Sequence, residues 1–174
     1  KRQDTLNYKK RHPLYLQKDG FKIALLNYTY GTNGLPVPKG FVVPHIDTTA
    51  IKQDIQLARQ DSATNIIAFM HWGYEYHNFP NKEQRALSKW LHEQGADMVI
   101  GSHPHVVQPI EYYISNKDTL GVTVFSLGNF ISNQSQQGTE GGICIRVTLT
   151  KPQNHPVRYQ MAVSYTHLTL PTNS

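Results

Sequence analysis

Residues 65–77 read NIIAFMHWGYEYH. The first six, from Asn65 to Met70, form a short apolar run, which predicts a buried β-strand. The run stops at His71, and the residues after it are polar or aromatic around the single glycine Gly73. We therefore predict a strand that passes directly into a loop with functional side chains.

Strands and helices alternate on both sides of this stretch. Asp47 and Asn81 are residue types that cap helices, and Gly95 is of the type that ends them. Apolar residues at helical spacing predict the inward faces. The predicted order is a strand at 21–30, a Gly- and Pro-rich loop at 31–44, a helix at 47–60 with Ile51, Ile55 and Ala58 inward, a strand at 65–70, a helix at 81–94 with Ala86, Leu87, Trp90 and Leu91 inward, and a strand at 96–100. This β-α-β-α-β order predicts parallel strands and an α/β fold.

The second half of the chain predicts a different layer. Strand-like runs at 122–127, 142–150 and 158–163 lie too close together for intervening helices, which favours antiparallel pairing. The last eleven residues, 164–174, resemble translated vector sequence and are expected to be a non-native tail, although a genuine final strand is the alternative. The expected domain therefore covers residues 1–163.

Composition excludes several classes of protein. The chain has 174 residues, enough for one domain with a core, and a formal net charge of +5. Its basic residues are scattered, so a nucleic-acid partner is not expected. No apolar stretch is long enough to span a bilayer. The single cysteine, Cys144, lies in an apolar run and is expected to be a small core residue.

Three histidines follow two of the predicted parallel strands. His71 ends the strand at 65–70, and His103 and His105 follow the strand at 96–100. Ligands collect at the carboxyl ends of strands in open α/β sheets, so adjacent strands would place the three imidazoles together. Imidazoles bind zinc-like ions and also occur in manganese and iron sites. We predict a metal site of His71, His103 and His105, in which the last two project to one side of an extended His-Pro-His segment.

Other polar residues near these histidines have open roles. Glu75 is a candidate ligand, an orienting carboxylate or a proton carrier, with an exposed loop acid as the alternative. Asn129 either caps a loop or reaches the site. Trp72, with Tyr74 and Tyr76, forms either an aromatic wall for a substrate or ordinary packing. His77 is expected to be exposed, and His92, within a helix, is left out of the site.

Three segments together resemble one protein family. They are HWGYEY at 71–76, GADMVIGSHPHVVQPIE at 95–111 and FSLGNF at 125–130, in this order and spacing. With residues 23–31 they resemble the CapA family of capsule and poly-gamma-glutamate synthesis, over roughly residues 20–132. That family is similar to the calcineurin-type metallophosphoesterases, so the resemblance implies a layered α/β sandwich whose N-terminal part, with further metal ligands, precedes residue 1.

The resemblance also implies a function. It implies divalent Mn, Fe or Zn ions, two of them in the full-length protein, with Glu75 and His105 as catalytic residues of a hydrolase acting on a phosphoester or an envelope polymer. The alternative is a non-catalytic envelope component that binds or guides an anionic capsule polymer. In both cases the expected location is the extracytoplasmic face of the cell envelope, reached through a missing N-terminal segment, and the expected partners are other capsule-synthesis membrane proteins.

Overall fold

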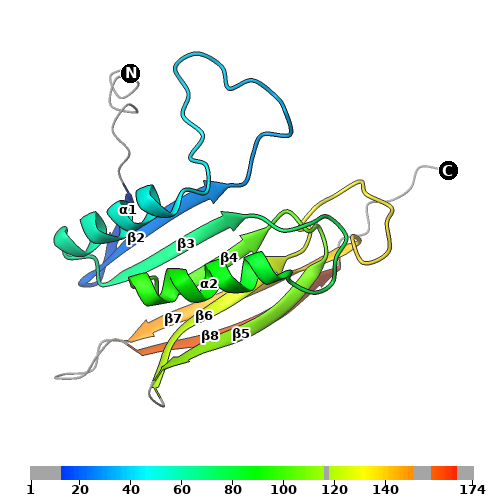
Figure 1. The fold of residues 1–174 in the computed structure, drawn as a ribbon. Helices are drawn as coiled ribbons and strands as arrows, with labels where there is room; N and C mark the ends of the chain where they lie inside the picture. Colours follow the sequence, from blue (N-terminus) through cyan, green and yellow to red (C-terminus); the bar gives the residue numbers. More distant parts are fainter. Residues whose placement is uncertain (1–12, 116–117, 151–157, 168–174) are drawn as a thin grey trace.

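A computed structural model describes residues 13–115, 118–150 and 158–167. The elements, in chain order, are β1 (Leu14–Lys18), β2 (Phe21–Thr29), α1 (Thr48–Gln60), β3 (Asn65–His71), α2 (Lys82–Gln94), β4 (Met98–Ser102), β5 (Val107–Ser115), β6 (Asp118–Leu127), β7 (Gly141–Thr150) and β8 (Arg158–His167) (Figure 1). The described chain is a mixed α/β fold, as the sequence predicted.

Six strands form the main sheet, in the order β1-β2-β3-β4-β6-β5. Strands β2, β3, β4 and β6 are parallel, while β1 and β5 pair antiparallel at the two edges. The parallel centre confirms the alternation of strands and helices in the sequence. Strands β7 and β8 form a separate antiparallel pair, which confirms the antiparallel layer for the runs at 142–150 and 158–163. The prediction is wrong for the run at 122–127, which lies in β6 of the main sheet and pairs in parallel with β4.

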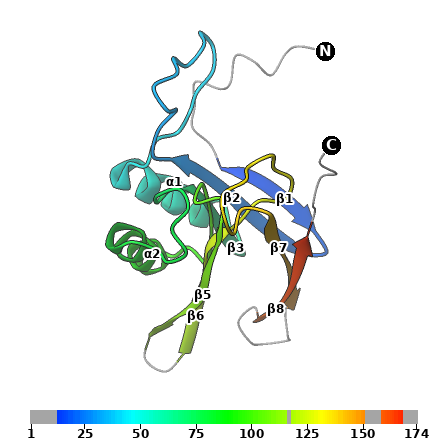
Figure 2. The same ribbon diagram turned by 90° about the vertical axis from the view of Figure 1, so that its right-hand side faces the viewer.

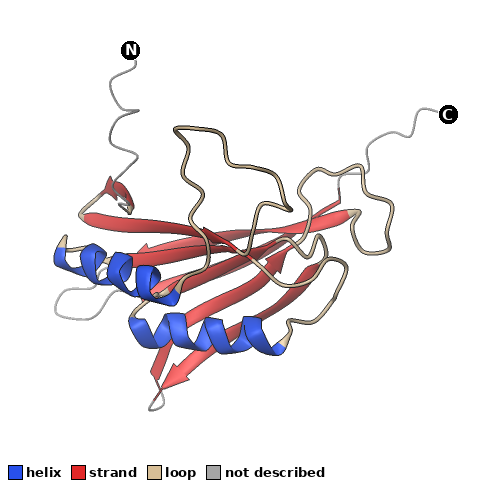
Figure 3. Cartoon of the chain, turned by 45° about the horizontal axis from the view of Figure 1, so that its top comes forward, coloured by secondary structure: helices blue, strands red, loops and turns tan. Residues whose placement is uncertain are grey.

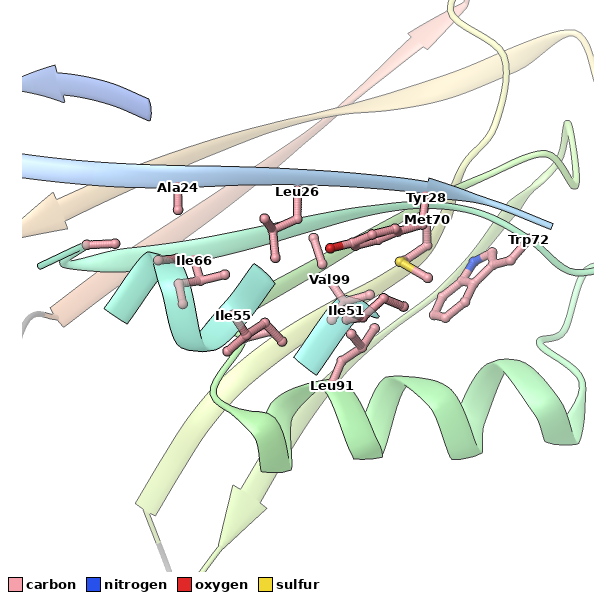
Figure 4. Close-up of a cluster of buried hydrophobic side chains, with 14 of the residues drawn as sticks. Ala24, Leu26, Tyr28, Ile51, Ile55, Ile66, Met70, Trp72, Leu91 and Val99 are labelled. Atoms are coloured by element: carbon pink, nitrogen blue, oxygen red, sulfur yellow. The ribbon is translucent and has the colours of Figure 1, made fainter. Parts of the chain in front are cut away.

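The molecule has three layers. Figure 2 shows α1 and α2 on one face of the main sheet and the β7–β8 pair on the other. The larger core lies between the helices and the sheet, where Ile51 and Ile55 of α1 and Leu91 of α2 pack against Ile66 and Val99 (Figure 4). A smaller cluster lies between the sheet and β7. It contains Met98, Ile100 and Val122, with Ile145 and Val147 packed against it.

The helix ends agree with the sequence. The Asp47 side chain accepts hydrogen bonds from the backbone N–H groups of Thr49 and Ala50, and Asn81 forms a capping box with Gln84. Gly95 ends α2 with a left-handed backbone. Asp54, on the buried face of α1, accepts a 2.8 Å hydrogen bond from the Tyr28 hydroxyl. The predicted inward residues of α1 are buried.

The inward face of α2 is a correction. Ala86 is exposed and Leu87 and Trp90 are only half-buried, while Gln84, Ser88 and His92 are buried beside Leu91. The helix is rotated because the strands beneath it present polar groups. Gln84 donates a 3.0 Å hydrogen bond to Gln108, and the Ser88 and Thr123 hydroxyls are 2.6 Å apart.

Two edge strands were not predicted. Strand β1 pairs with β2 across Asp19 and Gly20, which both have positive φ, as a tight hairpin turn requires. Most of its side chains are exposed, Leu14 and Leu16 among them, so no buried apolar face marks the strand. Strand β5 contains Pro109, a residue that sheets tolerate at their edges. Backbone pairing at an edge leaves little signal in the sequence.

The C-terminal hairpin differs from the prediction in two respects. Cys144 is exposed, so the expectation of a core residue is wrong. Ile143 and Ile145 take the inward positions of β7, and the alternation of a strand turns Cys144 outward. Strand β8 continues four residues beyond the predicted end and pairs Ser164 with Cys144. Residues 168–174 lie outside the described residues.

Candidate metal centre

Three parallel strands end at the same level of the sheet. In the register of β2, β3 and β4, Thr29 lies beside His71, and His71 lies beside Ser102. His103 therefore follows β4 immediately next to the end of β3, and His105 lies two residues further on. The long loop after β2 and the loops after β3 and β6 leave this end of the sheet (Figure 3).

Backbone hydrogen bonds hold these loops together. Trp72 donates its N–H to Ser102 O at 3.1 Å, Tyr30 donates to His71 O at 3.0 Å, and Tyr76 donates to Pro104 O at 2.8 Å. The third bond joins the loop after β3 to the His-Pro-His turn, which brings Glu75 toward His105. These main-chain contacts fix the relative positions of the loops that carry the side chains.

Strands β4 and β6 approach each other closely at Gly101, two residues before His103. A Cβ atom placed on Gly101 would lie 1.9 Å from the carbonyl oxygen of Phe125. The same oxygen accepts a 3.0 Å hydrogen bond from the Trp72 indole. Trp72 is 2% exposed, so of the two roles considered for it the structure shows packing. Only glycine fits at position 101 without a shift of the backbone.

The His-Pro-His segment is bent rather than extended, which corrects the predicted geometry. His103 and His105 have φ values of 98° and 62°, both in the left-handed region. Such values are uncommon outside glycine and occur often at functional sites. The bend still brings the two rings together, with centroids 6.0 Å apart. His103 also lies against His71, at 4.6 Å.

The surroundings of His71 and His103 favour the neutral form of these two rings. Burial, reinforced by the charge of His105 when protonated, lowers the pKa of His71. Burial and the charge of His71 lower the pKa of His103, against a smaller opposing effect of Glu75. A neutral ring offers a nitrogen lone pair, the form in which histidine binds metal ions.

Glu75 joins two of the histidines. One ligand atom each from Glu75, His103 and His105 lie within 4.8 Å of one another. The Glu75 carboxylate is 3.7 Å from Nε2 of His105, too far for a hydrogen bond. These three side chains with His71 are called the strand-end site below. Imidazole nitrogens with one carboxylate oxygen are a donor set that fits a divalent transition metal, so this part of the chain has side chains that can hold a metal ion.

The other candidates divide into two groups. Asn129 reaches the site, since its Oδ1 is 3.0 Å from Nδ1 of His105, and Tyr76 stacks on the His105 ring with centroids 6.1 Å apart. His77 is exposed, as expected, and Tyr74 is 59% exposed beside it. Neither is among the potential ligands grouped at the site.

Two residues of β2 and its loop were missed. Thr29 lies 2.8 Å from Nδ1 of His71 through its hydroxyl oxygen. The Tyr30 ring is 4.6 Å from the His103 ring and is stacked on His71 at 5.4 Å. Both follow from the parallel pairing of β2 with β3, which places the end of the first strand beside the end of the second. The predicted parallel pairing of these two strands was therefore the sequence signal that could have identified Thr29 and Tyr30 as site residues.

Residues 5–134 match the family described as bacterial capsule synthesis protein PGA_cap. The chain belongs to this family. The matched range includes the strand-end site and Asn129, and the β7–β8 hairpin lies beyond it.

Two curated relatives support the assignment to the capsule synthesis family. The chain is 31% identical over 158 residues to the PGA biosynthesis protein CapA of Bacillus subtilis (strain 168), and the match covers 84% of the chain and 38% of the relative. It is 34% identical to the capsule biosynthesis protein CapA of Bacillus anthracis, over 91 residues, 52% of the chain and 21% of that protein. The chain thus spans well under half the length of these relatives.

A solved structure supports the fold. The crystal structure of a hypothetical protein from Thermus thermophilus superposes with a TM-score of 0.50 at 15% identity, over 89% of this chain and 62% of the other. At this identity the likeness concerns the fold alone. Among the helices of the described residues, none has the length and apolar character needed to cross a membrane.

Proposed function

We propose that this member of the capsule synthesis family contributes its strand-end site to a metal-dependent hydrolase that acts on a phosphoester or another bond of an envelope polymer. The observation that carries the proposal is the grouping of Glu75 with His103 and His105 within 4.8 Å. His71 extends this group, since its ring touches that of His103. Zn, Mn and Fe are the ions that suit such a donor set.

In this proposal a bound metal ion and the protein side chains would have different roles. A bound divalent ion supplies a Lewis acid that polarises a phosphoryl oxygen and makes water more acidic. His103 and His105 would hold the ion as neutral ligands. Glu75 would either complete the ligand set or accept the proton of the attacking water. Its side chain is 44% exposed, so a proton that it accepts can pass to solvent.

A second function is favoured by the charge of the chain. A formal net charge of +5 attracts polyanions such as a carboxylate-rich capsule polymer. In this proposal the protein binds or guides the polymer without cleaving it, beside other capsule-synthesis membrane proteins. For both functions we propose the extracytoplasmic face of the cell envelope as the location, by analogy with the named roles of the relatives.

The test is metal content measured together with phosphodiesterase activity. The purified protein is compared with His71→Ala and His103→Ala, and with His77→Ala as a matched control on the same loop. The hydrolase predicts bound metal and chelator-sensitive activity that both site variants lose and the control keeps. A folded protein that binds no metal and hydrolyses nothing would refute it, and retention of the polymer would then favour the second function.

A further inference from the structure

Thr29 contacts Nδ1 of His71 in a way that determines where the hydrogen lies. Its hydroxyl oxygen is 2.8 Å from His71 Nδ1 and 2.8 Å from the carbonyl oxygen of Gly31, and it accepts a 3.2 Å bond from the Gly31 N–H. A hydroxyl has one hydrogen. The carbonyl oxygen cannot donate, so the hydroxyl hydrogen satisfies that contact. The contact with His71 is then satisfied only if Nδ1 carries a hydrogen.

Asn129 makes the equivalent contact with His105. Its Nδ2 donates to the Thr139 carbonyl oxygen at 3.0 Å and to Gln134 Oε1 at 2.9 Å. A backbone carbonyl is always an acceptor, so this contact fixes the orientation of the amide. The Asn129 Oδ1 atom therefore faces the ring, 3.0 Å from Nδ1 of His105. This oxygen can only accept, so Nδ1 of His105 carries a hydrogen as well.

We propose that Thr29 and Asn129 are positioning residues that hold His71 and His105 in the Nδ1–H tautomer, so that each Nε2 keeps its lone pair for a metal ion. The two contacts come from different elements, the end of β2 and the loop after β6, and give the same tautomer on two neighbouring rings. A ring free in water favours the opposite tautomer, with hydrogen on Nε2. Outer partners of this kind orient the ligands of metal sites.

His92 provides an internal reference outside the strand-end site. Its Nδ1 is 2.8 Å from the carbonyl oxygen of Ala96 and its Nε2 is 2.8 Å from the Thr123 hydroxyl. The carbonyl requires the Nδ1–H form here too. Neither Thr29 nor Asn129 contacts this ring in the described structure, so substitutions at those positions should leave its tautomer unchanged.

The experiment is nitrogen-15 NMR of the imidazole rings in the metal-free chain at mildly alkaline pH. The unaltered protein should show the Nδ1–H tautomer for His71, His105 and His92. Thr29→Val, which keeps the shape of the side chain but removes the hydroxyl, should move only His71 toward the Nε2–H form, while Thr29→Ser should restore the original signal. Asn129→Leu should move only His105, and Asn129→Asp should keep it.

The same variants are then titrated with Zn²⁺. Thr29→Val and Asn129→Leu should each weaken binding by about 10–100-fold, the usual effect of losing an outer partner, and Thr29→Ser should bind nearly as tightly as the original. Unchanged tautomers in folded Thr29→Val and Asn129→Leu proteins would overturn the proposal. Because the NMR measurement needs neither metal nor substrate, its outcome is separate from that of the proposed hydrolase, on which the choice of Zn²⁺ as probe rests.

Discussion

The strand-end site and the environment of His92 place histidines in opposite kinds of surroundings. Both nitrogens of His92 have hydrogen-bonding partners, and its ring is stacked on Tyr113 at 5.2 Å. At the strand-end site, His71 and His105 each have one nitrogen in a described hydrogen bond, and the rings face one another and Glu75. Burial lowers the pKa at His92 and at His71 alike. The difference that indicates ligand binding is therefore the unused nitrogen and the convergence of rings, rather than the pKa.

The largest loss of stability is expected when a methyl group is added to a glycine packed next to each region, Gly101 near the strand-end site and Gly121 beside His92. Gly101→Ala would place Cβ 1.9 Å from the backbone oxygen of Phe125, whereas Gly121→Ala would place it 2.3 Å from the His92 ring and 2.9 Å from the backbone oxygen of Asp97, a less severe approach to the main chain. Overpacking typically costs about 1–3 kcal/mol. Gly101→Ala should exceed this range and Gly121→Ala should fall within it, as measured by urea denaturation. Equal, small losses would show that the approach of β4 to β6 is looser than described.

Removing a histidine should have different consequences in the two regions. His92→Ala loses two buried hydrogen bonds and leaves a cavity, so the free energy of unfolding should fall by about 2–4 kcal/mol. His103→Ala removes a ring with no hydrogen bond among the described residues and should cost less than about 1 kcal/mol. Denaturation of the metal-free proteins measures both. A larger loss for His103→Ala would assign the strand-end site a structural role.

Metal removal should affect only the strand-end site. A ligand at 100 times its dissociation constant stabilises the folded state by about 2.7 kcal/mol, so a chelator should lower the melting temperature of a metal-loaded protein. The His103→Ala variant should show no such change, while His77→Ala should respond like the unaltered protein. A chelator effect that survives in His103→Ala would place the metal elsewhere.

The smallest effect is the dependence of stability on pH. Burial lowers the pKa of His92 in the folded state, so the unfolded chain binds more protons between that value and about 6.5. Stability is therefore full above about pH 6.5 and declines as the pH falls toward the folded pKa. Acid titration of the free energy of unfolding should show this decline, reduced in His92→Gln. An unchanged slope in the variant would assign the dependence to other groups.

Much of this arrangement was predictable from the sequence because it depends on local order along the chain. Apolar runs that end at His71 and just before His103, separated by a capped helix, predict adjacent parallel strands and hence neighbouring rings. The exclusion of His92 rested on its place within a helix, and its buried structural bonds agree with that exclusion. The parallel register would also have led to Thr29.

The remainder depends on contacts between distant residues. The left-handed backbone at His103 and His105 depends on the contact of the loop after β4 with the loop after β3, which forms only in the folded chain. The residues His-Pro-His do not by themselves predict this conformation. The polar face of α2 reflects Gln108 and Thr123, which lie in later strands. The edge strands β1 and β5 are held by backbone pairing with one neighbour each. Their exposed apolar side chains, such as Leu16 and Tyr112, mark no buried face in the sequence.

The most direct test of the metal centre is anomalous diffraction from crystals of the protein loaded with Zn²⁺. The account predicts a zinc peak at about 2.0–2.1 Å from Nε2 of His105 and from a ring nitrogen of His103, the usual zinc–nitrogen distance, with the Glu75 carboxylate nearby. Zinc bound at another place in the molecule, or coordination of His105 through Nδ1, would contradict it.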